Sequence, residues 1–132
     1  MTRAKPEDAW AAWVDVARWS DGDVIDTARL NGEFQEGSTI VSKPRGFPVA
    51  TWTITHAESP RLWVSESRAP GARMMAEHLI EPGRAATKLT ERVLFSGPLG
   101  GLVGRTVRRR LEATLASMTE QIAGEAERRS FA

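Results

Sequence analysis

The sequence has no cysteine, no tyrosine, two histidines and no long apolar run. Without cysteine the chain has no disulfide framework, no thiol nucleophile and no thiolate metal ligand. His56 and His78 have no further ligand at a useful spacing, so we expect neither a metal nor a cofactor. No window approaches the roughly 20 apolar residues of a membrane-spanning helix, and the N-terminus has no apolar leader. We therefore expect an unexported, cytoplasmic protein with no membrane span.

Opposite charges are nearly balanced along the chain. There are 18 Lys and Arg against 17 Asp and Glu, a net charge of +1, so the overall field gives no reason to expect nucleic acid as a partner. With 132 residues, of which 41% are hydrophobic, the chain has the size and core of one domain. We expect a single domain over residues 1–132. The five tryptophans suit either a core or the wall of an apolar pocket.

The spacing of apolar residues predicts two short helices, six strands and a long helix. Pro6, followed by two acidic residues, favours a helix start, and a second short helical piece around Trp19 ends at a cluster of Asp and Gly. Six runs rich in β-branched and aromatic residues follow, at 24–32, 37–44, 49–57, 61–69, 72–82 and 84–97. Their short connections predict an antiparallel sheet of about six strands.

After Pro98 the spacing returns to that of a helix. One apolar stripe runs across about six turns, formed by Val103, Val107, Leu111, Leu115, Met118, Ile122 and Ala126. Charged side chains occupy the other positions, so one side of the helix can lie on the sheet while the other meets solvent. The order of elements favours a curved sheet wrapped around this stripe, with the two short helices supporting its far end.

Three stretches carry a resemblance to a known family: "KPEDAWAAWVDVARW", "EHLIEPGRAATKLT" and "FSGPLGGLVGRTVRRRLEATLASM". Over nearly its whole length the chain resembles the polyketide cyclase and dehydrase group of the START-like (SRPBCC) superfamily. The resemblance implies an α+β helix-grip (Bet v 1-like) fold with a hollow rather than a fixed set of catalytic residues. Members open with a strand before the first helix, whereas here only "MTRAK" precedes Pro6. We therefore expect the last strand, Thr87 to Phe95, to keep an exposed edge.

The stretch "GPLGGLVGRT", residues 97–106, invites comparison with a phosphate-binding loop. The comparison fails twice, because Leu99 stands where the first glycine must be and Arg105 where the lysine must be. We interpret these glycines as a site of close packing or a hinge. The basic cluster that follows, Arg105, Arg108, Arg109 and Arg110, is interpreted as a solvated face, since Glu112 and the acidic tail balance it.

Glu91 is the most informative single residue. It lies in phase with Leu89, Val93 and Phe95, so its side chain should point inward. A carboxylate in an apolar interior costs several kcal/mol unless it is paired, hydrated or protonated, and such a group suits acid or base work. The structural alternatives are a salt bridge to an arginine or a bulge that turns Glu91 outward. His78 is either a hydrogen-bonded structural histidine or a proton carrier, and His56 is expected to be exposed.

We expect the protein to bind a small, mostly apolar molecule, such as a lipid or an aromatic compound, as a monomer or homodimer. The expected ligand-binding residues are Trp52, Ile54, Trp63, His78, Leu89, Glu91, Val107, Leu111 and Leu115. One alternative is an aromatase or cyclase type of enzyme that promotes aldol closure and dehydration, with Glu91 or His78 as proton carrier. Another is a protein-interaction module of the co-chaperone or ribosome-associated kind, using the arginine cluster. An apolar pocket favours a carrier, converging polar groups favour the enzyme, and a filled interior favours the interaction module.

Overall fold

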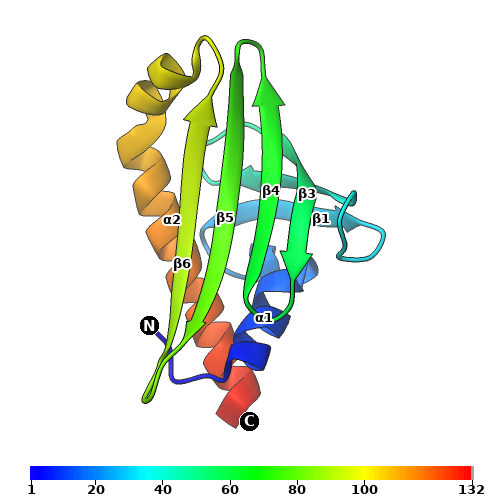
Figure 1. Cartoon of the computed structure of the whole chain (residues 1–132), viewed down its shortest axis with the longest axis vertical. Helices are drawn as coiled ribbons and strands as arrows, with labels where there is room; N and C mark the ends of the chain where they lie inside the picture. Colours follow the sequence, from blue (N-terminus) through cyan, green and yellow to red (C-terminus); the bar gives the residue numbers. More distant parts are fainter. Residues whose placement is uncertain (132) are drawn as a thin grey trace.

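One antiparallel sheet and one long helix make up most of the fold (Figure 1). The computed structural model describes residues 1–131, and of Val103 the backbone alone. The helices are α1 (Pro6–Val14), the 3-10 helix η1 (Val16–Asp21) and α2 (Gly100–Phe131). The strands are β1 (Ile25–Asn31), β2 (Thr39–Pro44), β3 (Ala50–Glu58), β4 (Leu62–Ala69), β5 (Ala72–Pro82) and β6 (Thr87–Ser96).

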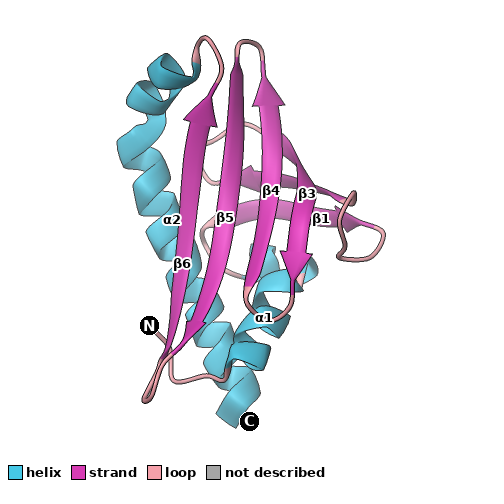
Figure 2. Cartoon of the chain, viewed as in Figure 1, coloured by secondary structure: helices cyan, strands magenta, loops and turns pink. Residues whose placement is uncertain are grey.

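The strands follow one another in space in the order β1-β2-β3-β4-β5-β6, each antiparallel to the next. The sheet curls, so that β1 and β2 cross behind β3 and β4 (Figure 2). Helix α2 runs along the sheet, and α1 packs against the C-terminal half of α2. This architecture confirms the predicted sheet, its long closing helix and the short N-terminal helices. None of the helices in the described part of the chain is both long and apolar enough to cross a membrane.

The core lies where α1, the inner face of the sheet and the lower part of α2 meet. Its largest fully buried side chains include Trp13, Trp63, Ile40, Ile54 and Ile80. Trp13 comes from the apolar face of α1, and the other four project from one face of the sheet because successive strand residues alternate between faces. Fully burying an aliphatic side chain of this kind stabilises the fold by about 1.5 to 3 kcal/mol.

The apolar stripe of α2 is buried over only part of its length. Met118, Ile122 and Ala126 are buried in the core. Val107, Leu111 and Leu115, the three residues of the stripe expected to line a cavity, are half-buried. Leu111 and Leu115 border a cavity there, and no close-packed layer lies beneath them. The side chain of Val103 lies outside the described residues.

The residues before the first helix form a single β-bridge, in place of the strand that the resemblance implies. The backbone of Thr2 pairs with Thr87 through two hydrogen bonds of 2.8 and 2.7 Å. The Thr2 hydroxyl donates to Glu127 at 2.9 Å, and the Thr87 hydroxyl donates to the carbonyl of Ala4 at 2.8 Å. The N-terminal segment therefore joins the start of β6 to the end of α2. Beyond this bridge β6 is an edge of the sheet.

A charged cluster ties η1 to the last turns of α2. Glu125 lies 2.9 Å from Arg128, 3.3 Å from Arg129 and 3.7 Å from Arg18. Burial alone would raise the pKa of Glu125, but the hydrogen bond from Arg128 and the charges of all three arginines outweigh it and lower that pKa. The cluster therefore favours the ionised carboxylate in the folded protein.

The glycine-rich stretch forms the turn after β6 and the first turns of α2. Gly97 has a φ of 92°, a left-handed conformation that favours glycine. A Cβ atom on Gly104 would lie 3.1 Å from the ring of Phe95, and one on Gly100 would lie 3.4 Å from the Phe95 backbone. Both glycines thus let α2 approach β6 closely, as expected from their spacing.

Candidate functional site

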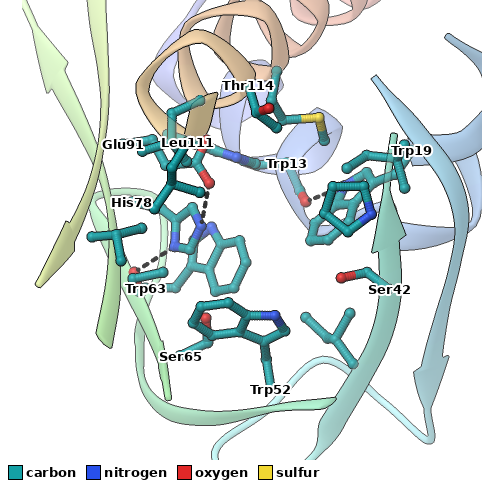
Figure 3. Close-up of a pocket in the computed structure, with 17 residues that line it drawn as sticks. Trp13, Trp19, Ser42, Trp52, Trp63, Ser65, His78, Glu91, Leu111 and Thr114 are labelled. Atoms are coloured by element: carbon teal, nitrogen blue, oxygen red, sulfur yellow. Dashed lines mark hydrogen bonds and ion pairs between the residues drawn. The ribbon is translucent and has the colours of Figure 1, made fainter. Parts of the chain in front are cut away.

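A cavity of about 100 Å³ lies between the inner face of the sheet and α2 (Figure 3). Tryptophan rings form much of its wall: Trp52 and Trp63 come from β3 and β4, Trp13 from α1 and Trp19 from η1. Leu111, Thr114 and Leu115 of α2 close the opposite side. The interior is therefore hollow and mostly apolar, whereas a filled interior was the feature expected of an interaction module.

Six of the nine expected ligand-binding residues line this cavity: Trp52, Trp63, His78, Glu91, Leu111 and Leu115. The other three lie elsewhere. Ile54 is fully buried in the core, and Leu89 packs in the same core near the start of β6. Val107 is half-buried about one turn of α2 before Leu111, beyond the cavity. His56, expected to be exposed, lies at the surface 3.4 Å from Glu58.

His78 and Glu91 form a buried pair inside the cavity. Register places them directly opposite one another on β5 and β6, and His78 Nε2 lies 3.0 Å from Glu91 Oε1. Their side chains are only 4% and 10% exposed. The inward direction of Glu91 follows the alternation of β6, and its partner is a histidine, which was neither of the two structural alternatives, an arginine salt bridge or an outward bulge. Apart from this pair and the hydroxyls of Ser42, Ser65 and Thr114, the described residues of the wall are apolar.

Aromatic rings fix the orientation of His78. Its imidazole stacks on Trp63 with a centroid separation of 3.5 Å and an interplanar angle of 3°. The ring of Trp13 meets the same imidazole edge-on at 5.2 Å. Since both faces and edges of aromatic rings interact favourably in these arrangements, His78 has little freedom to turn away from Glu91.

The other ring nitrogen of His78 determines how protons are placed in the pair. His78 Nδ1 lies 3.2 Å from the backbone carbonyl of Trp63, and because a carbonyl only accepts, Nδ1 must carry a proton. One further proton then lies between Nε2 and Glu91 Oε1, bound to one or the other. The pair is either a neutral histidine beside a protonated carboxyl or an imidazolium beside a carboxylate. In both forms its net charge is zero.

The second carboxyl oxygen of Glu91 is without a partner. Among the described residues, nothing hydrogen-bonds to Oε2, although the atom is buried. The indole N–H of Trp63 is also buried, and the part of the chain that the structure describes offers it no acceptor. Since both nitrogens of His78 and Glu91 Oε1 are engaged, Glu91 Oε2 is the one oxygen or nitrogen of the pair without a partner among the described residues, and it belongs to a side chain that lines the cavity. A buried polar atom left unpaired costs about 1 to 3 kcal/mol.

Comparisons with known proteins bear on the fold. No protein-family model matches the chain. No curated protein matches it in sequence. Among solved structures, the di-domain ARO/CYC StfQ from the steffimycin biosynthetic pathway matches at a TM-score of 0.73 and 12% identity, over 99% of this chain and 50% of StfQ.

Norcoclaurine synthase from Thalictrum flavum, in complex with dopamine and hydroxybenzaldehyde, matches at a TM-score of 0.65 and 12% identity, over 94% of this chain and 82% of the enzyme. A protein from Arthrobacter aurescens matches at a TM-score of 0.68 and 18% identity, over 96% and 82% of the two chains. The chain has the helix-grip fold. At these identities the likeness concerns the fold alone, and it confirms the expected fold class.

The loop between β2 and β3 contacts α2 beside the cavity. The loop after β2 reaches α2, where the guanidinium of Arg110 lies 4.9 Å from the centroid of the Phe47 ring. The same guanidinium donates a hydrogen bond to the carbonyl of Gly46. Pro44 and Leu111, which neighbour these residues in sequence, both line the cavity. Arg108 of the basic cluster also has a partner, Glu112 at 3.5 Å, and the cluster as a whole is exposed.

Several residues that line the cavity were not predicted from the sequence: Trp13, Trp19, Ile40, Ser42, Ser65 and Met118. A signal existed for the strands, because Ile40 and Ser42 share one face of β2, as Trp63 and Ser65 do on β4. Ambiguity in β4 came from Leu62 and Val64, which compete with Trp63 for the interior but are only half-buried. No sequence pattern indicated that α1 and η1 would supply two of the cavity's tryptophans.

Proposed function

We propose that the protein binds a small, mostly apolar molecule in the helix-grip cavity. The observation that carries the proposal is the cavity itself, a space of about 100 Å³ walled by tryptophan rings and left open inside the fold. Protein interiors are close-packed, with few voids larger than a water molecule, so a hollow of this size calls for an occupant. Norcoclaurine synthase, which shares the fold, has been seen in complex with dopamine and hydroxybenzaldehyde.

Filling the cavity tests the proposal. Leu111→Trp places a large ring at a half-buried position on the cavity wall, whereas Ala113→Trp places the same ring at an exposed position of the same helix. Toluene should bind the original protein and the Ala113→Trp variant, as followed by isothermal titration calorimetry, and should lose affinity for Leu111→Trp. Native mass spectrometry of freshly purified protein should show a retained small molecule with the same pattern. Equal binding by both variants would contradict the proposal.

A second candidate is an acid–base enzyme of the cyclase type, favoured by the His78–Glu91 pair. Glu91 Oε2 would take a proton from the carbon beside a ketone, and the resulting enolate would attack a second carbonyl to form a carbon–carbon bond. The same proton would return to the new alkoxide, and elimination of water would give a conjugated ring. His78 would hold and orient the carboxyl. StfQ, an ARO/CYC with the same fold, supports this candidate by analogy.

The enzyme candidate has its own experiment. A short linear diketone, whose closure gives a conjugated cyclohexenone, is incubated with the protein, and enone absorbance is followed. Glu91→Gln should abolish any closure above background, while toluene binding stays intact. Closure that is unchanged in Glu91→Gln, or absent from the original protein, would remove the candidate without touching the binding proposal.

A further inference from the structure

Glu91 Oε2 restricts what the cavity can hold. We propose that the ligand is a neutral, single-ring aromatic molecule bearing a hydroxyl group, of the phenol class, whose O–H donates to Glu91 Oε2. The inference rests on the proposed binding function and names the chemical class of its ligand. It follows from the protonation of the pair, its charge and the size of the cavity.

Protonation requires a donor on the ligand. The proton shared by the pair lies on the Oε1 side, between that oxygen and His78 Nε2. Whether it belongs to the carboxyl or to the imidazole, Oε2 remains an acceptor. A ketone, an ether or an ester offers this oxygen nothing, because each is itself only an acceptor. A group with O–H or N–H completes the one buried carboxyl oxygen that lacks a partner among the described residues.

Charge favours a neutral ligand. His78 and Glu91 together carry no net charge while the proton lies between them, and the rest of the wall is mostly apolar. An ammonium group entering this site would lose its hydration without gaining a countercharge. The indole N–H of Trp63, which also lines the cavity, is a buried donor for which the described residues supply no acceptor. A hydroxyl can donate to Glu91 Oε2 and accept from the Trp63 indole, whereas the nitrogen of an aromatic amine accepts only weakly.

Size limits the ligand to about one ring. Sites for drug-sized molecules enclose roughly 300 to 1,000 Å³, whereas an apolar cavity of about 150 Å³ takes up benzene. The cavity in this protein, at about 100 Å³, is closer in volume to the benzene-binding cavity. Its flat tryptophan walls favour a planar ring over a branched or extended chain.

Four probes of similar size separate these requirements: phenol, anisole, toluene and benzylamine. Anisole keeps the ring and oxygen but lacks the donor, toluene lacks the oxygen, and benzylamine carries a positive charge. In calorimetric titrations of the full chain, phenol should bind at least about tenfold more tightly than anisole or toluene, and benzylamine more weakly than phenol. Phenol and anisole binding equally, or benzylamine binding best, would overturn the inference.

Two variants test whether Glu91 causes the preference. In Glu91→Gln the amide N–H can donate to His78 Nε2, which leaves the amide oxygen where Oε2 stood, so the tenfold preference for phenol over toluene should persist. In Glu91→Met the acceptor is gone, and phenol should bind no better than toluene. Toluene binding also reports that each variant is folded. Failure of every ring to bind the original protein would defeat the binding proposal itself, whereas ring binding without a phenol preference defeats only the present inference.

Discussion

Helix α2 provides a sharp contrast between two residues of one stripe. Ile122 is 2% exposed in the core, so Ile122→Ala should cost about 2 to 5 kcal/mol of unfolding free energy, the range for buried truncations that leave a void. Leu111 is half-buried beside a space that already exists. Leu111→Ala removes three carbons at about 0.8 kcal/mol each when fully buried, and half burial without a new void leaves about 1 kcal/mol.

Urea titrations followed by tryptophan fluorescence would measure both changes, provided that the slope of the transition is the same for all variants. The difference between the two substitutions is the informative quantity, because both shorten an aliphatic side chain on the same helix. If Leu111→Ala lowered the free energy of unfolding as much as Ile122→Ala, the N-terminal half of the apolar stripe would be packed as core and the cavity would be absent. Filling by Leu111→Phe should then cost stability, whereas an open cavity should accept the larger ring with little loss.

Three further perturbations follow from particular contacts. His78→Leu should cost about 1 to 3 kcal/mol because it strands the buried carboxyl of Glu91, and adding Glu91→Leu should recover part of the loss in the same urea titrations. Gly104→Leu should lower the free energy of unfolding by about 1 to 3 kcal/mol, because the new side chain meets the ring of Phe95 at close range. Adding Phe95→Ala should recover part of that loss. ATP should not raise the melting temperature of any of these proteins. The pKa of Glu125 is lowered in the folded protein, so the ionised carboxylate stabilises the fold above the ordinary pKa of 4.5, and this contribution is lost as the pH falls below that value. In thermal melts, Glu125→Gln should therefore reduce the fall in melting temperature at acid pH.

Much of the fold could be predicted because its signals are local. Alternation and turn residues located all six strands to within three residues, and short connections between them implied antiparallel pairing. The apolar period of the last helix was equally clear. That period does not show how deeply each residue of the stripe is buried, because periodicity shows which side faces inward and carries no information on whether that side meets a packed layer or a hollow. Leu111 and Ile122 look alike in sequence for this reason.

The site was less accessible because its chemistry depends on register. Alternation alone indicated that Glu91 points inward, but the partner of Glu91 depends on which β5 residue stands opposite it. That pairing with His78 is a property of the whole hairpin. The proton arrangement depends in turn on a backbone carbonyl of a third strand, at Trp63, which no side-chain pattern encodes. The contributions of Trp13 and Trp19 likewise required the tertiary packing of α1 and η1.

A crystal structure of the protein grown with phenol tests the central claim most directly. The account predicts one ring in the cavity, beside the tryptophan walls, with its oxygen within about 3 Å of Glu91 Oε2 and the His78–Glu91 pair unchanged. A ring bound only at the surface, or a cavity that closes onto itself with Glu91 turned out to solvent, would contradict it.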